Sequence, residues 1–290
     1  MLVPRPHDTD LKIFVCLILI MLGFGTLMVH SSSMTSRPTD FEQVYLAKHL
    51  MFLAGGLVLG MAAAVVPPRY WRGASVPLFL LTVGLLVAVL LPGVGVKVNG
   101  AQRWFRGGGM SFQPSELAKI SLPLLLCTLL ERFPKLDEKW WTSFFIPLIP
   151  IGLLSGLVIV EPDLGTSLFL VVGGLILLFI RGWPLRNFAI AVGGLLPLVA
   201  FIGVWKPYQM RRLTGFVAAW TDLNEAPYQL QQSLATMGAG GILGTGLGKG
   251  WQKLSYLPEA NTDFVFAVIG EELGLVGTLS IILLWVGVYW

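Results

Sequence analysis

Three acidic residues in the last apolar segment of the sequence could do acid–base chemistry. Asp263 opens this segment, and Glu271 and Glu272 lie two to three helical turns further along it. Ionisable groups inside a membrane span are costly and usually serve a function. A carboxylate that is partly removed from water is a stronger base, which suits general-base catalysis. The alternative is that Asp263, or Thr262 beside it, caps the final helix, and the residues alone leave both interpretations open.

Positive charges gather in the segment 92–114, where Lys97, Arg103 and Arg106 follow one another closely. Such a group could hold an anion, for example a lipid pyrophosphate. Just beyond it, Glu116 and Lys119 have the i, i+3 spacing that places two side chains on one helix face. The equally supported alternative is a solvated loop above a structural ion pair.

A second acidic pair, Glu161 and Asp163, flanks Pro162 at a break between two apolar segments. Pro162 is expected to end the first of these helices. Asp163 could cap the next helix through the N–H groups of its first turn, or it could take part in catalysis. Capping is at least as well supported for Asp163.

The third polar stretch contains Gln232 and Ser233, the glycine-dense run 238–250, and then Glu259 and Thr262. The glycines do not form a phosphate-binding loop, because that motif needs a glycine five residues before the Gly-Lys pair and a Ser or Thr after it. This chain has neither. Glycine here predicts a tight re-entrant turn at membrane depth, or close passage of a lipid chain.

Eight apolar segments are expected to position these residues. Of the 290 residues, 55% are hydrophobic and 12% are charged, and the apolar residues come in blocks of near-membrane length. Blocks of about 18 or more apolar residues predict membrane-spanning helices. The fold class is therefore all-α, a polytopic transmembrane helical bundle. The predicted spans are 11–29, 48–66, 75–95, 115–130, 144–160, 165–180, 187–205 and 264–288.

The composition also excludes several classes of function. The chain has a net charge of +4 but no basic stripe with interleaved aromatic residues, so nucleic-acid binding is not expected. The cysteines, Cys16 and Cys127, both lie in apolar segments and are expected to be packing residues rather than a disulfide. The three histidines have no metal-ligand spacing.

The distribution of Lys and Arg over the short loops predicts a cytoplasmic N-terminus. With eight spans, the loop 92–114, the turn at Glu161–Asp163 and the long loop 206–262 then all lie on the outer side. Most of the unusual polar residues are therefore on one side of the membrane. A loop as long as 206–262 is typical of a functional element.

Together these segments resemble the SEDS family (shape, elongation, division, sporulation). The motifs are Asn-Gly-Ala-Gln-Arg-Trp (99–104) before Gln-Pro-Ser-Glu (113–116), Glu-Pro-Asp-Leu-Gly-Thr (161–166), and Leu-Pro-Glu-Ala-Asn-Thr-Asp-Phe-Val-Phe-Ala (257–267). The match extends over the chain from Leu11 onward. The stretches 252–259 and 270–274 look more like the division branch of the family than the elongation branch.

The resemblance implies a peptidoglycan glycosyltransferase that polymerises lipid II at the outer face of the bacterial cytoplasmic membrane. Asp263 would be the general base of an inverting transfer. A divalent cation, Mg²⁺ or Mn²⁺, could help to stabilise the leaving pyrophosphate, although no cofactor follows from the residues. Expected substrate-binding residues are Lys97, Arg103, Trp104, Arg106, Glu116, Lys119, Glu161, Asp163, Gln232, Ser233, Glu259 and Thr262.

The resemblance also implies partners, namely a class B penicillin-binding transpeptidase and other membrane proteins of the division machinery. Family members typically have ten spans, so we expect residues 1–290 to form a single domain of this type that is truncated at its C-terminus. Asn261 replaces the usual histidine of the family motif. Two other functions stay open: a lipid II flippase, and a scaffold without catalytic activity.

Overall fold

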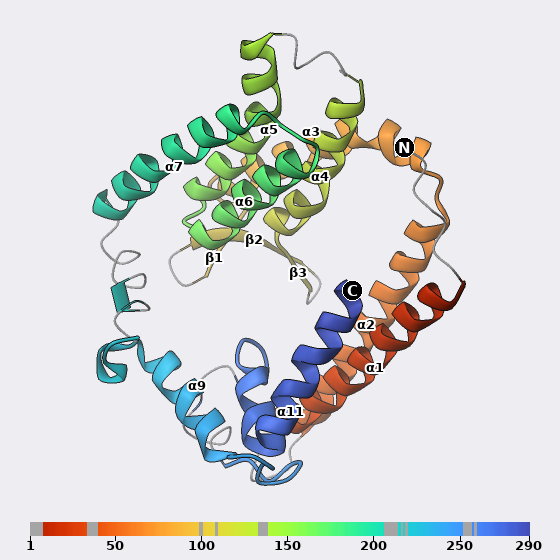
Figure 1. Ribbon diagram of the computed structural model, residues 1–290, viewed down its shortest axis with the longest axis vertical. Coiled ribbons are helices and arrows are strands. Elements are labelled where there is room, and N and C mark those ends of the chain that lie inside the picture. Colours follow the sequence, from red (N-terminus) through yellow and green to blue (C-terminus); the bar gives the residue numbers. More distant parts are fainter. Residues whose placement is uncertain are drawn as a thin grey trace. The chain divides into compact units, whose positions relative to one another are not determined.

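The computed structural model of this protein is mainly helical (Figure 1). It describes residues 8–33, 40–98, 101–107, 110–132, 139–205, 214–215, 217, 220–251, 257 and 260–290. The membrane-type helices are α1 (Asp8–Ser33), α2 (Asp40–Val65), α3 (Pro68–Leu90), α4 (Pro114–Arg132), α5 (Trp140–Val160), α6 (Leu164–Ile180), α7 (Leu185–Trp205) and α11 (Val265–Tyr289). The chain divides into two compact units, Ala62–Ile202 and Met1–Met61 with Gly203–Trp290.

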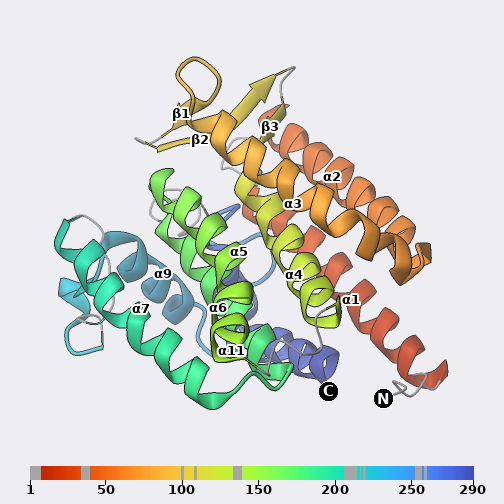
Figure 2. The same ribbon diagram turned by 90° about the horizontal axis from the view of Figure 1, so that it is seen from above.

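The unit Ala62–Ile202 is a helical bundle in which α3 packs on α4 and α5 packs on α6, while α4 also contacts α5 and α6 (Figures 1 and 2). Its core is built from leucines that are fully buried, among them Leu86, Leu126, Leu154 and Leu178. Because these helices alternate in direction, the end of α3, the start of α4, the end of α5 and the start of α6 meet at one end of the bundle.

A three-stranded antiparallel sheet covers this end of the bundle (Figure 2). Its strands are β1 (Val96–Val98), β2 (Ala101–Gly107) and β3 (Met110–Phe112). The Gln102 side-chain amide fixes β2 to the end of α3 by donating to the carbonyls of Val89 and Leu91, each at 3.0 Å. We expected only a loop in 92–114. Strand-favouring aromatic residues in β2 and pairing of its backbone on both sides explain the sheet.

The other unit is organised around α11, which packs against α1 and against the short helix α9 (Tyr228–Ala239). Met28, Val268 and Ile269 form part of its buried core. The segment 206–262 is more than a loop, since its described residues include α9 and the 3₁₀ turn η2 (Leu223–Glu225). After α9 the glycine-rich residues turn back onto α11.

All eight predicted spans are helices, which confirms the fold class. Five of the described helices, α1, α2, α3, α5 and α11, are long and apolar enough to cross a membrane. Among the others, α4 carries a charged residue in its first and last turns, and α6 is short at 17 residues. The bounds of two helices differ most from the prediction. α2 covers Asp40–Val65 rather than 48–66. α3 covers Pro68–Leu90 rather than 75–95, because Pro68 starts the helix at its first position and the sheet follows its end.

Candidate functional site

Asp163 connects three elements at the sheet-covered end of the unit Ala62–Ile202. It is the N-cap of α6, and its Oδ1 accepts from the Thr166 backbone N–H at 3.1 Å. Its Oδ2 accepts from Thr166 Oγ1 at 3.0 Å, from Arg103 Nη1 at 2.9 Å and from Gln113 Nε2 at 3.4 Å. The capping interpretation of Asp163 is therefore confirmed, and the same carboxylate also forms an ion pair that joins β2 to α6.

Arg103 is not a solvated loop residue, because its side chain is only 27% exposed and lies against Asp163. Its Nε is buried and has no hydrogen-bond partner among the described residues. Lys97 on β1 and Arg106 on β2 are exposed, and Trp104 on β2 is half-buried. The structure therefore places these four predicted residues on one small sheet, with Arg103 turned toward the bundle.

The predicted pair Glu116–Lys119 forms in the first turns of α4, with Lys119 Nζ 2.7 Å from Glu116 Oε1. The same ammonium lies 5.5 Å from the centroid of the Phe169 ring on α6, at a cation–π distance. Lys119 therefore links α4 to α6 as well as to Glu116. Sequence reasoning missed Gln113 and Thr166, although both lie within the motifs that it used.

Glu161 is the most unusual carboxyl group of this cluster. It follows the last residue of α5 and is fully buried, and neither of its carboxyl oxygens has a hydrogen-bond partner among the described residues. Burial, and to a lesser extent the neighbouring Asp163 charge, raise the pKa of Glu161 to about 8, although Arg103 acts in the opposite direction. Glu161 is therefore mostly protonated at neutral pH, in contrast to the ion-paired Asp163.

Replacing Glu161 with glutamine should remove one source of pH-dependent stability. The folded-state pKa lies above the ordinary value of 4.5, so the folded protein keeps a proton that the unfolded chain releases between pH 4.5 and about 8. Stability attributable to this group therefore falls as pH rises through that window and is level above it. As pH rises through this window, the free energy of unfolding of Glu161→Gln should increase relative to that of the wild type by up to about 1.4 kcal/mol per pH unit. Thermal unfolding of both proteins in detergent across this pH range tests the prediction. If the stabilities of the two proteins change with pH in parallel, the prediction is contradicted.

Asp263 lies in the other unit, in the turn that precedes α11, and its side chain is exposed. The N-cap position of α11 is Phe264, with no side-chain cap hydrogen bond. The capping alternative for Asp263 is therefore wrong, and its carboxylate is exposed to solvent just before the N-terminus of α11. Thr262 beside it is also exposed.

The remaining predicted residues of this unit belong to the segment before α11. Gln232 and Ser233 are half-buried on α9, the helix that packs against α11. Glu259 lies outside the described residues. The predicted site residues thus fall into two sets, one at the sheet-covered end of Ala62–Ile202 and one around the start of α11.

The described residues contain no group of three or more His, Cys, Asp and Glu side chains that could hold a metal ion. At the pair Glu161 and Asp163, the Arg103 guanidinium already supplies a positive charge. A divalent cation at this site stays a prediction.

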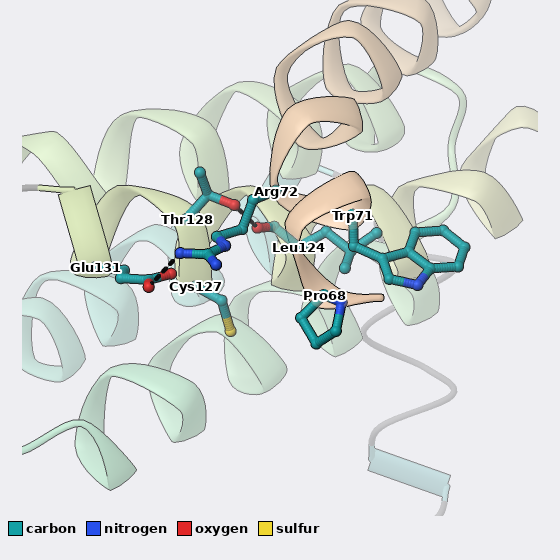
Figure 3. Close-up of a pocket in the computed structure, with 7 residues that line it drawn as sticks. All are labelled: Pro68, Trp71, Arg72, Leu124, Cys127, Thr128 and Glu131. Atoms are coloured by element: carbon teal, nitrogen blue, oxygen red, sulfur yellow. Dashed lines mark hydrogen bonds and ion pairs between the residues drawn. The ribbon is translucent and has the colours of Figure 1, made fainter. Parts of the chain in front are cut away.

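A pocket of about 300 Å³ lies elsewhere in the same unit, between the start of α3 and the end of α4 (Figure 3). It contains the ion pair of Arg72 Nη1 and Glu131 Oε1 at 2.6 Å, beside Trp71 and Cys127. None of the predicted site residues lines it. The length of α3 separates this pocket from the sheet by about 34 Å, so it is not part of the candidate site.

Several helices of membrane length in one chain, with charged and polar groups collected at helix ends, define a multi-pass membrane protein. Residues 11–290 match the family FTSW_RODA_SPOVE, described as "Cell cycle protein". The chain therefore belongs to the FtsW/RodA/SpoVE family, which confirms the resemblance to the SEDS proteins.

Named relatives support the same assignment. The chain is 41% identical over 282 residues to the "Probable peptidoglycan glycosyltransferase FtsW" of Coxiella burnetii, covering 96% of this chain and 75% of that protein. It is 41% identical to the protein of the same name in Tolumonas auensis, covering 97% and 72%. Both relatives carry the division-branch name FtsW, as the motifs indicated.

Solved structures agree as well. A chain from a study of the "structural coordination of polymerization and crosslinking by a peptidoglycan synthase complex" superimposes with a TM-score of 0.71 at 29% identity, covering 94% of this chain and 74% of that one. The rod shape determining protein RodA of Thermus thermophilus gives a TM-score of 0.64 at 27% identity, covering 95% and 71%. The helical arrangement is therefore that of the family.

Proposed function

We propose that this chain is a peptidoglycan glycosyltransferase that polymerises lipid II into glycan strands during cell division. The names of its relatives support the reaction class. The observation that carries the mechanism is the exposed carboxylate of Asp263 at the start of α11, which is not used as a helix cap. A base in this position can take a proton from a sugar hydroxyl and pass it to water.

In the proposed reaction Asp263 removes the proton of the acceptor sugar hydroxyl. The oxygen then attacks the anomeric carbon of the lipid-linked donor, a new glycosidic C–O bond forms, and the bond to the lipid pyrophosphate breaks. One base and a single displacement invert the configuration at that carbon, as in inverting glycosidases. The departing pyrophosphate carries the negative charge away and needs nearby cations.

Lys97, Arg103 and Arg106 are the cations that we propose for this role. Lys97 and Arg106 are exposed, so a phosphate can reach either side chain from solvent. Arg103 is held by Asp163 through Nη1, and its Nε is buried. Its role is therefore to fix the sheet as well as to add positive charge.

We further propose that the protein lies in the bacterial cytoplasmic membrane with its N-terminus in the cytoplasm. With that orientation, the starts of α4, α6 and α11 would lie on the outer side. The solved peptidoglycan synthase complex couples polymerisation with crosslinking. By analogy, the proposed partner is a class B penicillin-binding transpeptidase, together with other membrane proteins of the division machinery.

Incubation of the purified protein with lipid II, followed by separation of the glycan products, tests this function. The expected result is elongated glycan strands, and their length should change when the transpeptidase is added. Lipid II that stays monomeric under conditions where a known polymerase acts would contradict the proposal.

A lipid II flippase is the second candidate, and one observation favours it. α11 contains buried carboxylates and a non-helical residue, Gly274, at membrane depth, as transporters often do. Reconstitution in vesicles separates the two functions. A flippase moves lipid II across the bilayer without forming glycan, whereas the proposed polymerase forms glycan from lipid II already on the outer face.

A further inference from the structure

α11 is not one continuous helix. Gly274 has φ 66° and ψ −161°, which separates the N-terminal segment Val265–Leu273 from the rest of α11. The N–H groups of Leu275 and Val276 donate to the carbonyls of Gly241 and Ile242, at 2.9 and 3.2 Å. These acceptors belong to the glycine-rich turn after α9, so the turn supplies hydrogen bonds that a regular helix would make internally.

The same turn also binds the other side of the break. The backbone N–H groups of Thr245 and Gly246 donate to the carbonyls of Glu271 and Glu272, each at 2.9 Å. Gly244 has φ 79°, and a Cβ atom there would collide with the backbone of Glu272. Only glycine lets the turn approach α11 this closely.

Two buried carboxylates complete the attachment. Glu272 Oε2 accepts from Ser31 Oγ of α1 at 2.5 Å and from the Gly248 N–H at 3.0 Å. Glu271 Oε1 accepts from the Trp251 N–H at 2.7 Å. The side chain of Glu272 is fully buried, so these contacts replace the water that a carboxylate would otherwise need. Glu272 thereby joins α1, the turn and α11.

The consequence concerns Asp263. A continuous helix would transmit its orientation along its whole length, but the break at Gly274 removes that constraint from Val265–Leu273. The orientation of this segment, with Asp263 at its start, must then come from contacts made by the segment itself. Among the described residues, hydrogen bonds to the backbone carbonyls and the side chains of Glu271 and Glu272 are contacts of this kind.

We propose that Glu272, assisted by Glu271, is a positioning residue that orients the N-terminal segment of α11 and so aims Asp263 at the acceptor hydroxyl. This inference rests on the proposed glycosyl transfer. Its expected effect is on kcat rather than on substrate binding, because a reacting group displaced by about 1 Å can lose on the order of 100-fold in rate.

Steady-state polymerisation of lipid II by Glu272→Ala and Glu272→Gln tests the proposal. We expect the alanine variant to lose about 30-fold or more in kcat, with KM within about twofold. Ser31 Oγ and the Gly248 N–H both donate to the single atom Oε2, and the amide oxygen of glutamine can accept the same two hydrogen bonds. The glutamine variant should therefore recover most of the activity and keep the pH profile of the wild type.

Thr278→Val is the matched control. Thr278 is a buried polar residue of α11 on the far side of the break, and its hydroxyl donates to carbonyls of its own helix. Its replacement should leave kcat unchanged. Full activity of Glu272→Ala would overturn the proposal. A folded Glu272→Gln as inactive as the alanine variant would also overturn it, because the side chain would then act through its charge.

A spectroscopic test does not depend on catalysis. A spin label at position 262, in a protein whose two cysteines, Cys16 and Cys127, are replaced by serine, reports motion at the start of α11. Glu272→Ala should make this label more mobile, and Thr278→Val should not. An unchanged spectrum overturns the positioning role. If the wild type makes no glycan but the label responds, the proposed function fails and the structural part of this inference stands.

Discussion

Replacing Asp263 with asparagine is expected to lower kcat for lipid II polymerisation by about 1,000-fold, within the range usual for loss of a general base. The carboxylate is exposed in the turn before α11 and is not the N-cap residue, so the change should leave folding intact. Asparagine has nearly the same shape but cannot accept the hydroxyl proton. The measurement is a steady-state assay on purified protein, with thermal unfolding measured in parallel.

Asp222→Asn provides the control for that experiment. Asp222 is also an exposed aspartate of the same unit, and its Oδ1 accepts from the Asn224 N–H at 2.9 Å, a contact that asparagine can keep. We expect unchanged activity and stability. Polymerisation by Asp263→Asn at the wild-type rate would show that another group is the base, whereas the assignment of the chain to the family would stand.

The second large effect is expected for Asp163→Ala, which should destabilise the protein by about 2–3 kcal/mol. The change removes the cap of α6, for which about 1 kcal/mol is typical. It also leaves Arg103, which is only 27% exposed, without its ion-pair partner. The sheet should then separate from the end of the bundle, and activity should fall as well. Thermal unfolding in detergent measures the loss of stability.

Two variants separate the contributions of Asp163. Asp163→Asn keeps an oxygen for the cap but loses the charge, so it should have about half of the effect. Glu131→Gln breaks the Arg72–Glu131 pair in the same unit, where the two side chains are 51% and 58% exposed. Such exposed pairs contribute little, and a change within about 0.5 kcal/mol is expected. If Glu131→Gln and Asp163→Ala lower stability equally, burial of the Arg103–Asp163 ion pair does not explain its larger contribution.

The two sets of site residues differ in how they are held. Around Asp163, polar side chains connect a sheet to the ends of packed helices, and the ion pair is partly accessible to water. Around Glu272, the contacts are buried and join backbone segments across a break in a membrane helix. We therefore expect changes at Asp163 to affect stability first, and changes at Glu272 to affect the rate of the reaction.

The sequence by itself determined the class of the protein and the positions of its helices. Long apolar blocks separated by Pro, Gly and charged residues predict membrane helices because a backbone in lipid must satisfy its own hydrogen bonds. Contacts between residues close together in the sequence could also be anticipated from the sequence. The pair Glu116–Lys119 and the cap that Asp163 provides for Thr166 each span three residues, so spacing indicated the first and offered the second as one of two interpretations.

The tertiary structure decided the contacts between residues far apart in the chain. Arg103 and Asp163 are 60 residues apart, and Ser31 and Glu272 are 241 residues apart, so no local spacing could pair them. Burial of Glu161 and the break at Gly274 likewise depend on what packs against them. Helix formation in lipid is a local response to apolar sequence, whereas the partner of a buried polar group depends on which elements the fold brings together.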